Sequence, residues 1–364
     1  MADLNENETS GSTGTPLRLW QSRDMLVSWY ALFEARIRRW NGVSLGDRWV
    51  HLGGKRVTPI TQKKPPFWVW NAGMHQLYMS TFHITPGVAA EYLKALRHYR
   101  IRYVFGYASA MSALASALRA KGLVGSDLAV AISNAEPVDA FQRDLISSVF
   151  QCPVRDTYGQ AEIVSGASEC AHGALHMWPE VGVTEWVRDD SYEPIAVGEA
   201  GRMLCTGLLN MDMPLIRYEL GDRSTRAVED PGCPCGRRLP TIGAVEGRSF
   251  DVALTPAGVP VGSLGTIFHS GLPMREAQII QETLTRFRIK VVPAPGFAEK
   301  HAQDLRRGLQ SRIGESVEVV VETVETIART PAGKFRKQIS LLLDRFGNQI
   351  QRSEPRNGPK VPTR

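Results

Sequence analysis

Apolar residues recur along the chain with two periods, and the alternation of these periods predicts a mixed α/β fold. A spacing of three or four residues predicts amphipathic helices, which are expected at 22–40, 89–98, 108–121 and 137–150. Short apolar runs before and between them predict strands, which are expected at 48–52, 101–107 and 128–132. Strands that alternate with helices in this order predict a mostly parallel sheet.

The pattern changes twice in the second half of the chain. Short strands separated by turns predict a sheet-rich subdomain between residues 174 and 226. Beyond Gly247, the order helix, strand, helix, strand predicts a small α+β lid, with elements at 275–283, 288–292, 299–313 and 317–321. We therefore expect a large domain at 1–247, a C-terminal lid domain at 248–345 and a disordered basic tail at 346–364.

Composition places the chain among ordinary globular proteins. Of its 364 residues, 43% are hydrophobic and 22% are charged. No apolar run approaches the roughly 20 residues of a membrane helix, and the acidic start at 1–8 does not resemble a secretory signal. Five cysteines in a chain of this length favour a reducing compartment. The sequence therefore predicts a soluble, cytoplasmic protein with no membrane partner.

The net charge of +6 suggests nucleic acid, but its distribution does not. Half of the excess lies in the segment 347–364, which carries four basic residues and one acidic residue. Elsewhere basic and acidic residues are mixed, and no basic run is interleaved with aromatic residues as a single-strand binder requires. We expect no nucleic-acid partner.

Five short motifs carry the candidate chemistry. The first is the loop of Thr9, Ser10, Gly11, Ser12, Thr13 and Gly14, whose small residues allow backbone N–H groups to surround a phosphate. It lacks the Gly-Lys-Ser/Thr ending of a Walker loop, and alone it also fits a flexible linker. The other four motifs are DTYGQAE at 156–162, RYELGDR at 217–223, GRSFD at 247–251 and PAGKFR at 331–336. Taken singly, each also fits an ordinary turn or ion pair.

In this order and at these separations, the five motifs resemble the adenylate-forming superfamily of acyl-CoA ligases, luciferases and adenylation domains. The similarity is greatest to the phenylacetate–CoA ligase branch, which includes CapK-like proteins. The segments 169–178 and 233–237, the latter Cys-Pro-Cys-Gly-Arg, resemble that branch specifically. The resemblance extends from residue 9 to about 340. It implies a large α/β body with a β-rich subdomain and a small C-terminal α+β lid.

The resemblance also implies the activity and the residues that perform it. The chain is expected to be an AMP-forming acid–thiol ligase that uses ATP, Mg²⁺ and CoA. The loop 9–14 would clamp the β- and γ-phosphates, and Glu162 would hold Mg²⁺. Lys334 would lie between the substrate carboxylate and the α-phosphate. The remaining nucleotide-binding residues implied are Asn134, Ala135, Glu136, Asp156, Thr157, Tyr158, Gly159, Asp222 and Arg248.

Individual roles follow for three of these residues. Tyr158 would stack on adenine, Asp222 would accept both ribose hydroxyls, and Arg248 would support the ribose or phosphate from a hinge at 248–251. Rotation of the lid about that hinge would admit the second substrate. A small carboxylic acid is the expected substrate, and a homodimer is one expected assembly.

Three departures from the family pattern keep alternatives open. Ala161 stands where a hydroxyl residue is usual, Phe250 stands where an acid is usual, and only eight residues precede the phosphate loop. The large domain is therefore expected to be N-terminally short. One alternative is adenylation followed by amide formation with an amine acceptor. Another is a shortened, weakly active paralogue that acts as a partner subunit.

Cysteine and histidine spacing predicts a structural metal site. Cys170, His176, Cys233 and Cys235 lie at turn-rich points and supply a Cys₃His set that suits tetrahedral zinc. His172 could replace His176, and two unrelated cysteine pairs are the simpler alternative. Cys152 and Cys205 have apolar neighbours and are expected to be core thiols.

An aromatic segment at 67–76 predicts the wall of the acid pocket. The pocket residues proposed are Trp70, Asn71, Tyr107 and Ser109. Aromatic residues in such a segment are also common in an ordinary apolar core.

Overall fold

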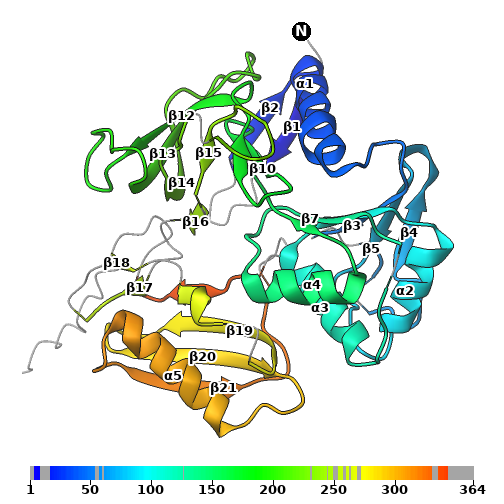
Figure 1. Ribbon diagram of the computed structural model, residues 1–364, viewed down its shortest axis with the longest axis vertical. Helices are drawn as coiled ribbons and strands as arrows, with labels where there is room; N and C mark the ends of the chain where they lie inside the picture. Colours follow the sequence, from blue (N-terminus) through cyan, green and yellow to red (C-terminus); the bar gives the residue numbers. More distant parts are fainter. Residues whose placement is uncertain are drawn as a thin grey trace, which may run out of the picture.

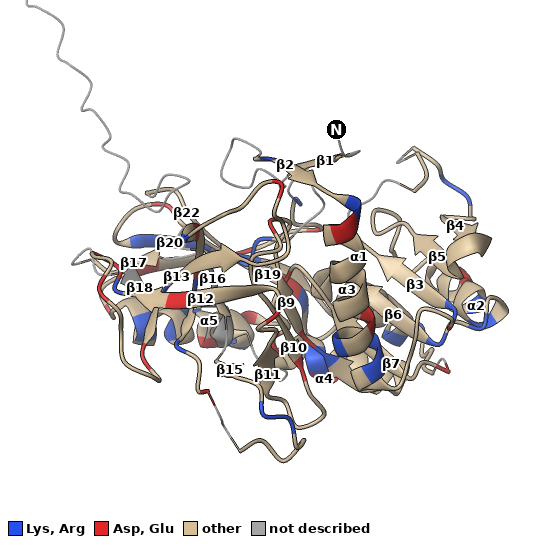
Figure 2. Cartoon of the chain, turned by 90° about the horizontal axis from the view of Figure 1, so that it is seen from above, with Lys and Arg blue, Asp and Glu red and all other residues tan. Residues whose placement is uncertain are grey.

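The computed structural model describes residues 4–8, 17–53, 57–59, 61–125, 127–229, 232–243, 245–248, 253–256, 260–261, 264–268, 272–329 and 335–342. These residues form a body, built on a six-stranded sheet with two four-stranded sheets beside it, and a lid with its own sheet (Figure 1). Within these ranges, no helix is both long and apolar enough to cross a membrane. Acidic and basic residues are interspersed along the described chain in the view of Figure 2.

The central sheet of the body is mostly parallel, as the alternation of strands and helices predicts. Its order is β4-β5-β3-β6-β7-β8, and only β4 runs antiparallel to its neighbour. The strands are β3 (Trp49–Leu52), β4 (Trp68–Asn71), β5 (Gln76–Met79), β6 (Tyr103–Gly106), β7 (Val130–Ser133) and β8 (Val154–Arg155). The carboxyl ends of the parallel strands lie along one edge, where ligands bind in sheets of this kind.

Three helices cover one face of this sheet, and their bounds lie close to the predicted ones. They are α2 (Ala89–His98), α3 (Ala108–Arg119) and α4 (Ala140–Phe150). Their apolar residues form one core with alternate strand residues such as Val104 and Ala131. Helix α4 begins after the predicted Pro137, because Asp139 caps it in a capping box with Gln142.

The opposite face of the sheet packs against the N-terminal helical segment. Here α1 (Arg23–Phe33) continues into a π-helical turn, η1 (Glu34–Arg38), and a 3-10 turn, η2 (Arg39–Asn41), so the predicted helix is present with two changes of pitch. Trp49, Tyr103 and Phe105 form a second core with this segment. Arg38 is buried there, and its Nε donates to Tyr103 Oη at 2.7 Å.

Two four-stranded antiparallel sheets form the predicted sheet-rich subdomain. Their orders are β15-β11-β10-β9 and β12-β13-β14-β16, and Met203 and Cys205 lie in the core that they share. The strands are β9 (Thr157–Gly159), β10 (Gly166–Glu169), β11 (Leu175–Met177), β12 (Gly182–Val187), β13 (Ala200–Gly207), β14 (Tyr218–Thr225), β15 (Thr241–Ile242) and β16 (Val245–Arg248). A hairpin of β1 (Asn5–Glu8) and β2 (Arg18–Gln21) precedes α1.

The lid is a four-stranded sheet packed against helix α5 (Glu299–Ile313). Its order is β21-β20-β19-β22, with β19 (Met274–Gln281), β20 (Arg286–Pro293), β21 (Glu318–Thr323) and β22 (Gln338–Ser340). Three short elements complete it, namely β17 (Ala253–Leu254), β18 (Pro260–Val261) and η4 (Leu264–Ile267). The helix predicted at 275–283 is wrong, because this segment is the strand β19, paired on both sides by β20 and β22.

Candidate active site and metal centre

A strained turn follows β7 at the carboxyl edge of the central sheet. Its middle residue, Ala135, has a left-handed φ of 59°, which costs a non-glycine residue roughly 1–2 kcal/mol. The Asn134 N–H donates to the Gly106 carbonyl at 2.9 Å, and Asn134 Oδ1 is buried with no hydrogen bond in the described structure. Backbone strain and an unpaired buried acceptor at this edge are typical of a binding site.

Glu136, the last residue of the turn, contacts both body and lid. Its Oε2 accepts the N–H of Ser109, at the start of α3, at 2.9 Å. Its Oε1 accepts the N–H of Phe335, in the lid, at 2.8 Å. The resemblance implied that Glu136 is a nucleotide-binding residue, and the structure shows its carboxylate bonded to these two backbone amides.

Tyr158 and Asp222, the predicted adenine and ribose residues, lie in direct contact. Tyr158 on β9 donates from Oη to Asp222 Oδ2, on β14, at 2.7 Å. Burial, and then the neighbouring Asp222 carboxylate, raise the pKa of Tyr158 well above its usual value, so the phenol remains a donor. Arg248, at the end of β16, pairs with Asp222 in the strand register. The structure therefore brings these three predicted residues together.

Other residues of the DTYGQAE motif bond to the end of β7 and to the segment that follows it. Thr157 Oγ1 donates to the Ser133 carbonyl at 2.6 Å. The Asp156 carboxylate accepts the N–H groups of Val138 and Thr157 at 3.3 and 2.9 Å. Burial outweighs these bonds and raises the pKa of Asp156 to about 7. Gly159 ends the strand β9.

Glu162, the predicted magnesium ligand, follows this motif and is 8% exposed. Tyr218 Oη donates to its Oε1 at 3.4 Å. The carbonyl of the preceding Ala161 accepts a bond from Gln21 Nε2 at 3.3 Å. A largely buried carboxylate needs positive charge or strong donors around it, and it suits a hard cation such as Mg²⁺.

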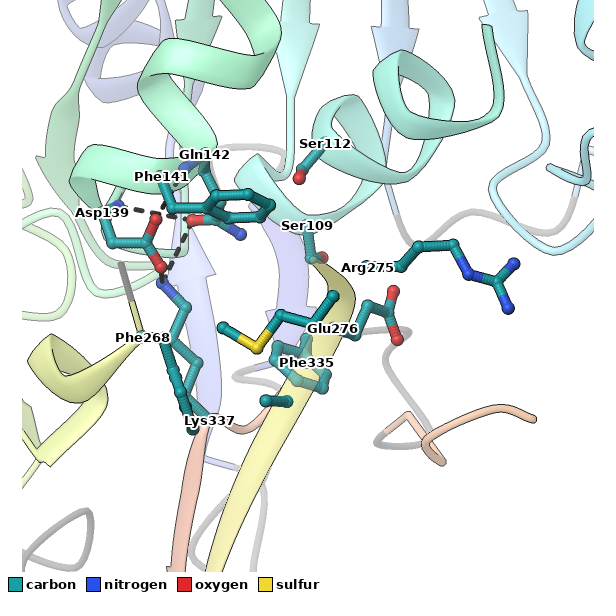
Figure 3. Close-up of a pocket in the computed structure, with 12 residues that line it drawn as sticks. Ser109, Ser112, Asp139, Phe141, Gln142, Phe268, Arg275, Glu276, Phe335 and Lys337 are labelled. Carbon is teal, nitrogen blue, oxygen red and sulfur yellow. Dashed lines mark hydrogen bonds and ion pairs between the residues drawn. The ribbon is translucent and has the colours of Figure 1, made fainter. Parts of the chain in front are cut away.

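Two predicted parts of the site, the phosphate loop 9–14 and Lys334, lie outside the described residues. Phe335 and Lys337 are described, and Lys337 Nζ forms an ion pair with Asp139 Oδ2 at 2.8 Å. A pocket lies between lid and body here (Figure 3). It is lined by Ser109, Ser112, Asp139, Phe141, Gln142, Phe268, Met274, Arg275, Glu276, Ala277, Phe335 and Lys337.

The four residues proposed for the acid pocket lie at two different places. Tyr107 and Ser109 follow β6 at the carboxyl edge of the sheet, beside Glu136. Trp70 and Asn71 lie on β4, where Asn71 pairs with the first residue of β5. Because β4 is antiparallel, its end lies at the amino edge of the parallel strands, and Trp70 stacks on Tyr99. The structure therefore does not bring Trp70 and Asn71 into the site.

The four predicted metal ligands form a single cluster. The ligand atoms of Cys170, His176, Cys233 and Cys235 all lie within 4.8 Å of one another. The Cys170 and Cys233 Sγ atoms are 3.8 Å apart, and Cys235 Sγ is 3.2 Å from His176 Nε2. His176 Nδ1 lies 3.2 Å from the Leu239 carbonyl, a contact that orients the ring and leaves Nε2 for a metal.

Burial and hydrogen bonding shift the pKa values of individual thiols in different directions. Burial raises the pKa values of Cys152 and Cys205 to about 12, as expected of inert core thiols. At Cys235, burial opposes ionisation, but hydrogen bonds from Arg237 and from the neighbouring thiols outweigh it and lower the pKa to about 6. A thiol that ionises this readily is a suitable metal ligand.

A known family model matches the lid, and two known proteins are similar to most of the chain. Residues 258–340 match the family model of the CapK C-terminal domain. The chain is 27% identical over 340 residues to protein CapK of Staphylococcus aureus, covering 91% of this chain and 73% of that protein. It is 23% identical over 304 residues to phenylacetate–coenzyme A ligase of Thermus thermophilus, covering 74% of this chain and 67% of the ligase.

Solved structures share the fold over most of the chain. A 2-hydroxyisobutyryl-CoA ligase gives a TM-score of 0.69 in its postadenylation state, at 21% identity, covering 92% of this chain and 73% of the ligase. In its thioesterification state the score is 0.52, at the same identity and coverage. An amide bond synthetase from Marinactinospora thermotolerans gives 0.59 at 16% identity, covering 92% of this chain and 67% of that one. The predicted α/β fold, which is that of adenylate-forming CoA ligases, is confirmed, and the sequence is similar over most of its length to CapK and to a phenylacetate–CoA ligase.

Proposed function

We propose that this protein activates a carboxylic acid with ATP and transfers the acyl group to CoA. One observation carries the proposal: motifs distant in sequence converge at the carboxyl edge of the central sheet, with Tyr158 bonded to Asp222 and the lid bonded to Glu136. A relative with this activity, a phenylacetate–coenzyme A ligase, and a fold neighbour solved with an acyl-adenylate support the same chemistry.

In this proposal the body binds the adenosine half of ATP. Asp222 accepts the two ribose hydroxyls through its carboxylate, whose orientation is fixed by the Tyr158 hydroxyl at 2.7 Å. The buried Oδ1 of Asn134 accepts the amino group of adenine. The ring of Tyr158 and the neighbouring residues of the DTYGQAE motif would surround the adenine base.

The reacting groups lie on the phosphate side of this pocket. A carboxylate oxygen of the acid attacks the α-phosphorus, and pyrophosphate leaves with the bond electrons. Glu162, largely buried, would hold Mg²⁺, which neutralises phosphate charge when bound. The loop 9–14 and Lys334 have the residue types that stabilise the developing charge.

The acceptor in the second step is CoA, whose thiol sulfur attacks the acyl carbon and displaces AMP. An amine acceptor, which would give an amide, is the second candidate. It is tested as well because an amide bond synthetase is among the proteins with this fold. Both acceptors require the same adenylate.

The test separates the two half-reactions. We expect pyrophosphate exchange that depends on an acid from a panel of aryl, fatty and amino acids. Lys334→Ala should abolish this exchange and leave the thiolysis of supplied acyl-adenylate intact. Products formed with CoA or with amines then identify the acceptor. Exchange that is unaltered in Lys334→Ala would overturn the assignment, and no exchange with any acid would favour a role as a partner subunit.

The Cys₃His cluster is the structural zinc site in this proposal. Bonds of about 2.3 Å to sulfur and 2.0–2.1 Å to nitrogen place the ligands of a tetrahedral zinc centre about 3.5–3.8 Å apart. The Cys170 and Cys233 Sγ atoms, 3.8 Å apart, have this spacing; Cys235 Sγ and His176 Nε2 are somewhat closer, at 3.2 Å, and all four atoms lie within 4.8 Å of one another. Four protein ligands leave no open position, so the site is structural rather than catalytic.

Metal content tests this part directly. We expect about one zinc ion per chain in the purified protein, lost in Cys170→Ser, with a lower melting temperature because structural zinc stabilises the folded state. Cys152→Ser is the control, because this buried thiol lies in the helix-covered core and not in the cluster. Equal zinc content in the two variants, or no zinc in the parent protein, would contradict the assignment.

A further inference from the structure

One edge of the lid is fixed to the body by side chains that surround the start of α4. The Phe335 N–H donates to Glu136 Oε1, and the other oxygen of Glu136 is held by Ser109. Lys337 Nζ bonds Asp139 Oδ2 at 2.8 Å and Gln142 Oε1 at 3.0 Å (Figure 3). We call these groups, Glu136, Asp139, Lys337 and the Phe335 amide, the latch.

On the lid side, the latch is rigidly attached to the sheet. Gln278 Nε2 on β19 donates to the Arg336 carbonyl at 2.6 Å, and the Ile279 N–H donates to the Lys337 carbonyl at 2.8 Å. On the body side, Asp139 also caps α4 and is therefore fixed in place. Since both halves are fixed, a bond across the latch restricts the position of the whole lid.

The latch is also partly shielded from water. The side chains of Lys337 and Asp139 are only 23% and 24% exposed, so their attraction is screened less than that of a surface pair. Glu136 is charged and accepts two backbone amides, the kind of bond that is stronger than one between neutral groups. Release of the lid would leave Glu136 with one of these two amides.

The arrangement of the chain is closer to one state of a solved ligase than to another. Against the same ligase, and over the same share of this chain, the TM-score is 0.69 with the postadenylation state and 0.52 with the thioesterification state. The chain as a whole thus superposes better on the first of these two structures. The contacts of the latch belong to that arrangement.

We propose that Glu136 and Lys337 are positioning residues that hold the lid in the arrangement for adenylation and must separate before acyl transfer. The inference rests on the proposed function and adds to it the residues that select the first half-reaction. Neither residue reacts with the acid or with ATP in this scheme. Their effect is on the fraction of molecules whose lid is in place.

Substitutions of Lys337 test the latch with a readout that a merely structural residue would not change. Lys337→Met should lower acid-dependent pyrophosphate exchange about five- to tenfold and leave the thiolysis of supplied acyl-adenylate unchanged or faster. Lys337→Arg, which can still reach the Asp139 carboxylate, should restore most of the exchange. Lys300→Met, an exposed position on the lid helix α5, is the matched control and should change neither rate.

A second measurement does not depend on activity. Hydrogen–deuterium exchange of the peptide that contains Phe335 should be faster in Lys337→Met and in Glu136→Gln than in the parent protein, and unchanged in Lys300→Met. Glu136→Gln replaces one acceptor oxygen by an NH₂ group, which cannot accept a backbone N–H.

The outcomes separate the latch from the function on which it rests. Faster deuterium exchange at Phe335 together with loss of the first half-reaction alone supports the proposal. Equal slowing of both half-reactions, or unchanged deuterium exchange at Phe335, overturns it. If the parent protein shows no pyrophosphate exchange with any acid, the proposed function fails and the positioning role fails with it, while deuterium exchange still reports whether the contact itself exists.

Discussion

The hydroxyl group of Tyr158 offers a direct test of how the adenosine pocket is held together. Tyr158→Phe deletes a donor that lies 2.7 Å from Asp222 Oδ2. Asp222 is 9% exposed, so water replaces the lost donor poorly. A hydrogen bond to a charged group contributes about 1.5–3 kcal/mol net. We therefore expect the free energy of unfolding to fall by about 2 kcal/mol.

The same substitution should weaken the binding of ATP. An Asp222 carboxylate that has lost the Tyr158 hydroxyl is oriented less firmly, and it accepts hydrogen bonds from the ribose hydroxyls less well. We expect the KM for ATP to rise about tenfold, which corresponds to about 1.4 kcal/mol, with a much smaller change in the KM for the acid. Pyrophosphate exchange measured at varied ATP and varied acid gives both constants.

A conservative control accompanies the stability assay. Urea denaturation followed by tryptophan fluorescence gives the free energy of unfolding. Tyr30→Phe removes a hydroxyl from α1, at a residue that is 60% exposed, and should change this energy by less than about 0.5 kcal/mol. If Tyr158→Phe unfolds at the same urea concentration as the parent protein and keeps its KM for ATP, the bond to Asp222 does not hold the site.

Two further substitutions test the sheet and a buried carboxyl. Gly106→Ala should lower the free energy of unfolding, measured by urea denaturation, by about 3 kcal/mol, because its Cβ would lie 2.2 Å from the Leu52 carbonyl oxygen. Gly87→Ala is the control and should leave this energy almost unchanged, because its Cβ meets only ordinary contacts. Equal stabilities of the two variants would refute this reasoning. Burial raises the pKa of Asp156 from 3.8 to about 7, so the folded state binds more protons between these values. The free energy of unfolding should then fall by up to about 1.4 kcal/mol per pH unit as pH rises through this range. This fall should be smaller in Asp156→Asn, which has no carboxyl group to titrate at this position. Equal dependence of the unfolding free energy on pH in the two proteins would contradict the prediction.

Much of the fold follows from local sequence patterns, but one wrongly predicted element in the lid depends on contacts that such patterns do not contain. The helices Ala89–His98 and Glu299–Ile313 were predicted with the bounds that the structure gives them. The segment 275–283 was predicted as a helix, and it does contain Arg, Glu, Ala and Gln residues, which favour helices. It is a strand because β20, the next element of the chain, and β22, which lies much further along it, satisfy its backbone groups on both sides.

The site was predictable only where its residues stand in recognisable motifs. Spacing alone left His172 and His176 as alternative ligands, and the structure brings His176 to the cluster while His172 is exposed. Trp70 was proposed for the pocket from its aromatic neighbours, but strand direction decides which edge it reaches. Nothing in the sequence pairs Lys337 with Asp139, 198 residues earlier, since this contact forms only when the lid meets the body.

The register of β10 has a consequence for how faithfully the chain folds. Ser168 on β10 lies opposite Thr157 of β9 on one side and His176 of β11 on the other. A slip of one residue would turn every side chain of the slipped strand to the opposite face. Cys170 and His176 could then not meet while Tyr158 faces Asp222. The thiol and imidazole cluster thus marks correctly paired molecules, because a mispaired chain would carry scattered thiols and no complete pocket for adenosine.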